Sequence, residues 1–180
     1  MSGTHNLGNA LAASLAAQAL GATPQEMASV LRRFVGLEHR HRTVHTGNGV
    51  IWVDDSKATN VGATVAALKG YDDDTVHLIL GGQGKGQDFS PLVDEVRRAA
   101  ACVYLIGEDG PAIGQRLAGS TPIEACATLE EAVRRARAQA STGQWVVLAP
   151  ACASFDQFAN YAERGDRFAA LARKEAEPCP

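Results

Sequence analysis

Hydrophobic positions in this chain follow two spacings, which separate helices from strands. Leu7, Leu11 and Leu15 recur every fourth residue, so residues 6–20 are predicted to form a helix that stops near Gly21. Further helices are predicted at 24–35, 61–68, 90–96, 111–117 and 129–140 and in a last region ending at 173. Short apolar runs predict strands at 43–45, 50–53, 76–80, 103–106, 123–125 and 145–148.

The order of these elements predicts the fold class. The first two helices follow each other directly and are expected to form a hairpin, with a capping box at 23–26 opening the second. From residue 50 onward strands and helices alternate with short connections. That alternation predicts an α/β protein with a mostly parallel sheet and helices on both faces. The Asn48-Gly49 pair between two strand-like runs adds a β-hairpin at the start of the sheet.

The segment 51–60, IWVDDSKATN, is a candidate ligand site. An apolar strand gives way to Asp54, Asp55, Ser56 and Lys57, and then to a helix that Thr59 or Asn60 could cap. Ligands of open α/β sheets bind where strands end, and a helix N-terminus together with a lysine favours an anionic group. Taken alone, the same residues are equally compatible with a solvated loop.

Two later segments have the same character. Residues 81–88, GGQGKGQD, place Lys85 in a glycine-rich loop after a strand, and residues 150–158 place Ser154 among small residues after another. Carboxyl ends of neighbouring parallel strands lie at one edge of a sheet, so Lys57, Lys85 and Ser154 could converge there. The alternatives are a surface glycine turn for the first loop and, for Ser154, a helix cap.

Composition narrows the range of functions. The 180 residues are 46% apolar and 21% charged with a net charge of −3, as expected of a globular domain, and there is no basic block to bind nucleic acid. No apolar run approaches the roughly 18 residues of a membrane span, and the N-terminus does not resemble a signal peptide. Four widely spaced cysteines predict reduced, mostly buried thiols, no zinc site and a cytoplasmic location.

Several catalytic motifs are excluded by spacing. The loop at 81–88 is not a Walker A motif, because Lys85 is followed by glycine and the first glycine is misplaced, and it is not GxGxxG. Ser154 lacks the GxSxG context of a serine hydrolase, and Cys152 lacks a histidine motif that would make it a nucleophile.

Five strings together resemble the Mur ligase family: GTHNLGN at 3–9, GLEHR at 36–40, DDSKATN at 54–60, GGQGKGQDF at 81–89 and PACASFDQFANYAERG at 150–165. Their order and spacing agree across nearly the whole chain. The resemblance implies that residues 1–35 are the closing helices of a central ATPase domain and that 36–180 are a C-terminal Rossmann-like ligase domain. The phosphate loop, magnesium ligands and modified lysine of the family are absent, so we expect a fragment that is inactive alone.

The strings SKATN and PACASFDQF are most similar to the members that join D-glutamate to UDP-N-acetylmuramoyl-L-alanine in peptidoglycan biosynthesis. The resemblance implies an ATP-dependent, amide-forming reaction through an acyl phosphate. The complete enzyme is expected to be a monomer that uses ATP and Mg²⁺. Neither ATP nor Mg²⁺ is expected to bind tightly to this fragment. Two alternatives stay open. The chain could belong to another Mur ligase or a folylpolyglutamate synthetase-like ligase, or it could be a non-catalytic Rossmann-like binding module.

The resemblance also assigns residues. D-Glutamate would be held by Thr59 and Lys85 at one carboxylate and by Ser154, with backbone near Phe155 and Tyr161, at the other, while Lys57 lies close by. Tyr161 departs from the phenylalanine common in the family, which a backbone contact would tolerate.

The nucleotide is assigned to two segments. Asn6 and Asn9 would face the adenine, and Arg40 and Asp55 would meet the ribose and phosphates as the C-terminal domain closes. From the residues alone, Asn6 reads more simply as a helix cap and the segment around Arg40 as a solvated linker.

Overall fold

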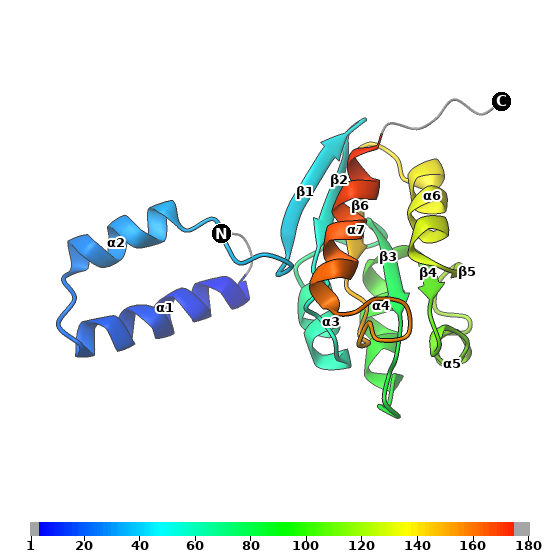
Figure 1. Cartoon of the computed structure of the whole chain (residues 1–180), viewed down its shortest axis with the longest axis horizontal. Helices are drawn as coiled ribbons and strands as arrows, with labels where there is room; N and C mark the ends of the chain where they lie inside the picture. The colour runs from blue at the N-terminus through cyan, green and yellow to red at the C-terminus, as the bar shows by residue number, and fades with distance from the viewer. Residues whose placement is uncertain (1–3, 175–180) are drawn as a thin grey trace. The chain divides into compact units, whose positions relative to one another are not determined.

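The computed structural model describes residues 4–174, with side chains from residue 7 onward, and divides the chain after Glu38 into two compact units. The first unit contains α1 (Thr4–Ala19) and α2 (Pro24–Arg33), which contact each other (Figure 1). The capping box is confirmed. Thr23 Oγ1 accepts the Glu26 N–H at 3.3 Å, and the Thr23 N–H donates to Glu26 Oε2 at 2.8 Å.

The second unit is a six-stranded sheet flanked by helices (Figure 1). Its strands are β1 (Arg42–Gly47), β2 (Val50–Asp54), β3 (Val76–Gly81), β4 (Ala100–Ile106), β5 (Ile123–Ala127) and β6 (Trp145–Leu148). Its helices are α3 (Val61–Leu68), η1 (Ser90–Leu92), α4 (Val93–Ala99), α5 (Gly110–Arg116), α6 (Leu129–Gln139) and α7 (Tyr161–Arg173). The strand order is β1-β2-β6-β3-β4-β5, and only β1 runs antiparallel to its neighbour. The predicted mostly parallel α/β fold is confirmed.

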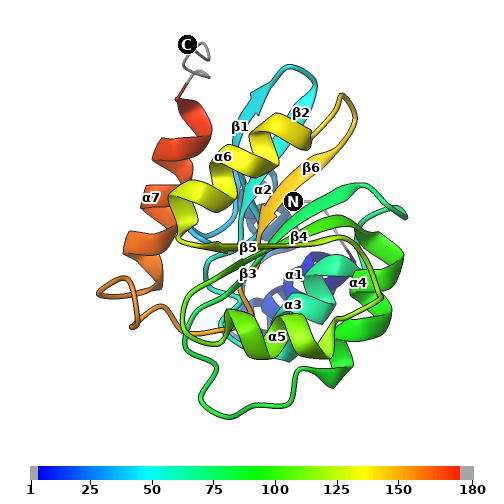
Figure 2. The same ribbon diagram turned by 90° about the vertical axis from the view of Figure 1, so that its right-hand side faces the viewer.

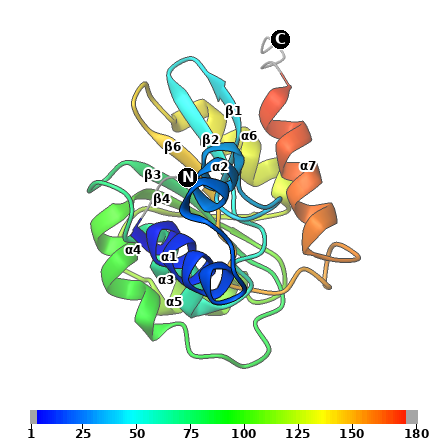
Figure 3. The same cartoon turned by 90° about the vertical axis from the view of Figure 1, so that its left-hand side faces the viewer.

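Helices cover both faces of the sheet, as the alternating pattern predicted. Residues of α3, α4 and α5 pack with one set of strand side chains, whereas residues of α6 and α7 pack with the other. Figures 2 and 3, seen from opposite sides, show the same division. In β3, Leu78 and Leu80 belong to the first core cluster and Ile79 to the second, so successive residues of one strand enter opposite cores. All six residues of β3 are buried, which explains why all but His77 are apolar or glycine.

The junctions agree with the sequence except around residue 90 and before α7. Asn48 and Gly49 both have positive φ, as the hairpin turn requires, and Asn60 caps α3 by accepting the Ala63 N–H at 2.9 Å. Ser90, expected to cap the next helix, instead opens a short 3₁₀ turn. Its N–H and hydroxyl donate to Asp88 Oδ1 at 3.0 and 2.7 Å, because a serine beside an aspartate makes a local turn readily.

Two predictions from composition can be compared with the structure. Cys102, Cys126 and Cys152 are buried free thiols, as expected, while Cys179 lies outside the described residues. Within residues 4–174, no helix is both long and apolar enough to cross a membrane.

Candidate functional site

The three loops singled out from the sequence follow β2, β6 and β3, which are consecutive strands of the sheet. Backbone hydrogen bonds join two of them, since Gln83 and Ala153 exchange N–H···O bonds of 2.9 and 3.0 Å. The Gln87 side chain connects the third loop, which follows β2, to the other two. Its oxygen accepts the Val61 N–H at 3.1 Å and its nitrogen donates to Ala151 O at 2.7 Å. The loops therefore form one connected surface at the carboxyl edge of the sheet.

Two lysines on this surface lie over aromatic rings. The Lys57 ammonium is 3.8 Å from the centre of the Tyr161 ring, and the Lys85 ammonium is 5.5 Å from that of Phe155. Lys85 itself has a left-handed backbone, with φ +56°. In the described part of the chain neither lysine forms an ion pair with a carboxylate. Their charges are thus available to an anionic ligand.

Ser154 and Thr59 occupy the same loops. Ser154 is buried, and its carbonyl accepts the N–H groups of Gln157 and Phe158 at 3.1 and 2.8 Å, so it opens a turn. The alternative interpretation of Ser154 as a helix cap is wrong. Asn160 caps α7 by accepting the Glu163 N–H, because the chain makes that turn before the helix starts. Thr59 is half-buried, and its N–H donates to Lys57 O at 2.8 Å.

Sequence reasoning missed Arg164, which joins two of the loops to α7. Its guanidinium is only 1% exposed and donates to Ser56 Oγ, Ser56 O and Cys152 O, each at 3.0 Å. Burial lowers the pKa of Arg164 to about 10, so it stays charged at neutral pH. An arginine on the amphipathic pattern of a final helix is normally solvent-exposed, so its position in the sequence did not distinguish it.

Sequence reasoning also missed the buried contact between His39, which it placed in a linker, and Asp54. His39 Nδ1 lies 2.7 Å from Asp54 Oδ2, both side chains are buried, and Asp54 Oδ1 accepts the Ser56 N–H at 2.9 Å. Gly165 of α7 packs against this pair, where a Cβ would lie 2.7 Å from Asp54 Oδ2. A glycine inside a predicted helix was the available signal, because such a glycine marks close packing.

Arg40 and Asp55, both assigned to the nucleotide, lie near each other. Burial is the main reason that the pKa of Asp55 is raised to about 6, and the charge of Asp54 raises it further. The hydrogen bond from the His41 N–H (3.1 Å) and the charge of Arg40 lower it in part. A hydrogen bond of 3.3 Å joins His41 Nε2 to the Tyr71 hydroxyl, which anchors this end of the site to the core. Asp55 is thus a half-buried carboxylate beside an exposed guanidinium.

The other two nucleotide residues belong to the helical unit. Asn9 is exposed on α1, and the side chain of Asn6 lies outside the described residues. Their assignment to the adenine therefore stays a prediction. Cys152, by contrast, supports the rejection of a thiol nucleophile, since burial raises its pKa to about 12. Among the described residues, no three His, Cys, Asp or Glu side chains are grouped closely enough to hold a metal ion.

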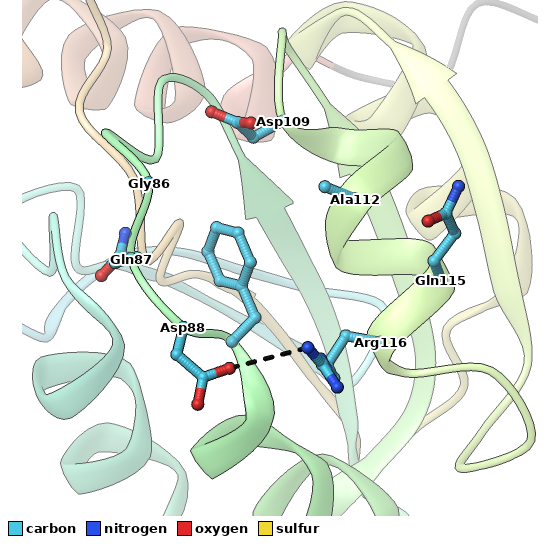
Figure 4. A pocket seen from close by; sticks show the side chains of 8 residues that line it. Gly86, Gln87, Asp88, Asp109, Ala112, Gln115 and Arg116 are labelled. Atoms are coloured by element: carbon cyan, nitrogen blue, oxygen red, sulfur yellow. Dashed lines mark ion pairs between the residues drawn. The ribbon is translucent and has the colours of Figure 1, made fainter.

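A pocket of about 820 Å³ lies between the loop after β3 and α5 (Figure 4). Asp88 and Arg116 face each other across it at 4.0 Å, and Asp109 Oδ2 on its wall accepts the Gly84 N–H at 2.6 Å. None of the residues predicted from the sequence to bind substrate lines this pocket. The pocket therefore adjoins the surface that carries Lys57 and Lys85, since Gln87 belongs to both, but neither lysine lines it.

The mostly parallel sheet, its strand order and the polar loops at one edge define a Rossmann-like α/β domain with a candidate ligand site at the carboxyl ends of its strands. Residues 39–152 match the family described as Mur ligase, glutamate ligase domain, and the chain therefore belongs to the Mur ligase family. It is similar to proteins named UDP-N-acetylmuramoylalanine--D-glutamate ligase. It is 49% identical over 169 residues to that of Hahella chejuensis, with 92% of this chain covered, and 53% identical over 175 residues to that of Bordetella pertussis, with 97% covered. It spans 38% and 34% of the lengths of these two relatives.

Solved structures agree on the fold. UDP-N-acetylmuramate-alanine ligase from Thermotoga maritima matches with a TM-score of 0.70 at 17% identity, covering 94% of this chain and 38% of that one. The UDP-N-acetylmuramoylalanyl-D-glutamyl-2,6-diaminopimelate--D-alanyl-D-alanyl ligase from Acinetobacter baumannii matches with a TM-score of 0.67 at 19% identity, covering 97% and 38%. At these identities the likeness establishes the fold and leaves the substrate open.

Proposed function

We propose that this chain is the amino-acid-binding part of an ATP-dependent ligase that adds D-glutamate to UDP-N-acetylmuramoyl-L-alanine in peptidoglycan biosynthesis. The observation that carries the proposal is the pair Lys57 and Lys85, which lie on loops joined at one sheet edge and have no acidic partner among the described residues. A dicarboxylic amino acid carries two carboxylates, and two lysines on one surface suit these charges. The identity of about 50% to relatives named for D-glutamate supports this amino acid over others.

The binding roles follow from the position of each side chain. Lys85 and Thr59 take one carboxylate of D-glutamate. Ser154, with the adjoining backbone near Phe155 and Tyr161, takes the other, and Lys57 adds a second positive charge. Held in this way, the amine can meet an acyl carbon in a fixed direction, and such positioning can supply about 7 to 11 kcal/mol of a barrier in the best cases.

The acyl carbon would come from the L-alanine carboxylate after activation by ATP to an acyl phosphate. Arg40 and Asp55 would meet the ribose and phosphates, and Asn6 and Asn9 the adenine. When bound, Mg²⁺ would neutralise phosphate charge, and its ligands are not among the residues assigned in this chain. The uncharged amine of D-glutamate would attack the acyl carbon, and phosphate would leave from the resulting tetrahedral intermediate. With loss of a proton from the nitrogen, this forms the amide.

The binding part of the proposal can be tested on this chain directly. D-Glutamate and, separately, L-glutamate are titrated into the isotope-labelled chain while backbone amide shifts are followed, a method that tolerates millimolar affinities of about 4 kcal/mol. We expect selective shifts around Thr59, Lys85 and Ser154 with D-glutamate. Equal shifts with both enantiomers would point to a different amino acid, and no shifts with either would count against an acceptor site formed by this chain.

A chimaera tests the selectivity in catalysis. This chain replaces the equivalent part of the Hahella chejuensis relative, and ADP release is measured with UDP-N-acetylmuramoyl-L-alanine and a panel of amino acids. D-Glutamate should be the preferred acceptor. Preference for a diamino acid or for L-glutamate would identify another ligase of the family, and the Lys85→Met chimaera should lose acceptor-dependent ADP release.

A further inference from the structure

Tyr161 contributes more than backbone to the surface that carries Lys57 and Lys85. Its ring face lies directly under the Lys57 ammonium at 3.8 Å, well within the roughly 6 Å at which a cation and an aromatic ring attract each other. The side chain is only half-buried, so apolar burial alone does not explain where the ring lies.

Several contacts fix this ring in place. The Tyr161 carbonyl accepts the Ser56 hydroxyl at 2.7 Å, and Ser56 Oγ accepts from the buried Arg164 Nε at 3.0 Å. The ring also contacts the His39 ring edge to face, with centroids 6.0 Å apart and planes at 78°. Tyr161 is the first residue of α7, directly after the Asn160 cap. The aromatic face is therefore held by the loop after β2 and by the helix start.

A ring and a carboxylate would hold a lysine with different consequences. A carboxylate would neutralise the ammonium, whereas an aromatic face attracts it through the ring quadrupole and leaves its full charge. A lysine side chain carries about 2 kcal/mol of rotamer entropy, part of which is lost on binding unless the chain is already ordered. A ring under the ammonium can order the side chain before the ligand arrives.

We infer that the Tyr161 ring is a positioning residue that orders the Lys57 ammonium for a carboxylate of the amino-acid substrate. This inference rests on the proposed function for the identity of the ligand. It rests on the observed geometry alone for the ordering of Lys57. Lys85 over Phe155, at 5.5 Å, repeats the arrangement with a ring from the loop that leads into α7.

The ordering can be tested without any ligand. The side-chain protons of Lys57 next to its ammonium should resonate upfield of those of an exposed lysine such as Lys69, because they lie in the shielding cone of the ring. Tyr161→Phe keeps the ring and should keep the upfield shift, whereas Tyr161→Leu should abolish it. An unchanged shift in Tyr161→Leu, or an ordinary shift in the unmodified chain, would overturn the inference.

The consequence for binding is tested by titrating D-glutamate into the same variants. Tyr161→Leu should weaken binding by about three- to tenfold, and Tyr161→Phe should bind as the unmodified chain does. In a Lys57→Met background, Tyr161→Leu should add no further loss. A full additional loss there would mean that Tyr161 acts through the fold and would overturn the positioning role; dispersed amide spectra confirm that each variant is folded.

The two proposals fail differently. If the unmodified chain binds no D-glutamate while the ring shift of Lys57 is present and lost in Tyr161→Leu, the proposed ligand is wrong and the ordering of Lys57 stands. If D-glutamate binds and Tyr161→Leu changes neither the shift nor the affinity, the ligand is right and the positioning role is wrong.

Discussion

At the scale of single residues, burial opposes the charges of both Asp55 and Arg164, and it is the largest influence on the pKa of each. The two residues differ in how their neighbours compensate for burial. Asp55 accepts the His41 N–H, whereas the guanidinium of Arg164 donates three hydrogen bonds, to Ser56 Oγ, Ser56 O and Cys152 O. These two residues give opposite stability predictions when their charge is removed.

Removing the charge of Asp55 should stabilise the chain near neutral pH. The pKa of Asp55 rises from 3.8 to about 6 in the folded protein, so the folded state holds its proton more tightly than the unfolded state does. The free energy of unfolding should therefore fall between about pH 4 and pH 6, by at most on the order of 3 kcal/mol, and the loss persists above pH 6. Urea unfolding from pH 4 to pH 8 should show a shallower fall for Asp55→Asn. If Asp55→Asn showed the same fall in the free energy of unfolding with pH as the unmodified chain, the raised pKa of Asp55 would be contradicted.

Removing the charge of Arg164 should have the opposite effect. Arg164→Met leaves the Ser56 and Cys152 carbonyls without their donor, and we expect a loss of about 3 kcal/mol in the free energy of unfolding. Arg167, on the same helix, is the matched control. Its exposed ion pair with Glu130 predicts a loss below about 1 kcal/mol for Arg167→Met. Chemical denaturation of both variants measures the difference, and equal losses would refute the structural role of Arg164.

At the scale of elements, α7 approaches the end of β2 so closely that only glycine fits at one position. Gly165 faces the His39 and Asp54 side chains, which lie in the same layer as Ser56 and the Tyr161 carbonyl. The approach of a helix to a strand end thus determines where the Tyr161 ring and Lys57 lie.

A pair of glycine substitutions tests this packing. Gly165→Ala should lower the free energy of unfolding by about 1 to 3 kcal/mol, because the new methyl group overlaps Asp54. Gly62→Ala in α3 would bring the new methyl group only to van der Waals contact, with Asn60 Oδ1 nearest at 3.5 Å, and should stabilise by about 0.5 to 1 kcal/mol. Thermal or urea unfolding of both variants gives the comparison. A neutral Gly165→Ala would mean that α7 and β2 are less closely packed.

At the scale of the whole molecule, stability should be distributed unevenly between the two units. In the sheet unit every residue of β3 is buried, whereas α2 has no buried residue. Amide protection follows burial and cooperative hydrogen bonding, and it is lowest where apolar contacts are few.

Hydrogen exchange measured by mass spectrometry tests this distribution. Peptides from β3, β4 and β6 should exchange slowest, those from β1 and β5 at the sheet edges faster, and those from α1 and α2 fastest. Equal protection of α2 and β3 would show that the two units unfold together.

Local sequence determined the elements of this protein and the chemistry of its loops. Apolar periodicity and caps such as Thr23 and Asn60 act within a few residues, so strand, helix and turn positions were predictable, and so was the mostly parallel sheet that follows from their alternation. The lysines at strand ends were visible for the same reason, because they interrupt an apolar run abruptly.

Tertiary structure alone decided which of these loops meet and what supports them. The position of β6 between β2 and β3 brings Ala153 beside Gln83, and burial of Arg164 and His39 depends on how α7 crosses that edge. These contacts join residues more than 60 positions apart, such as Arg164 to Ser56 and Lys57 to Tyr161. No local spacing encodes such pairs, since they arise from the packing of the whole sheet unit.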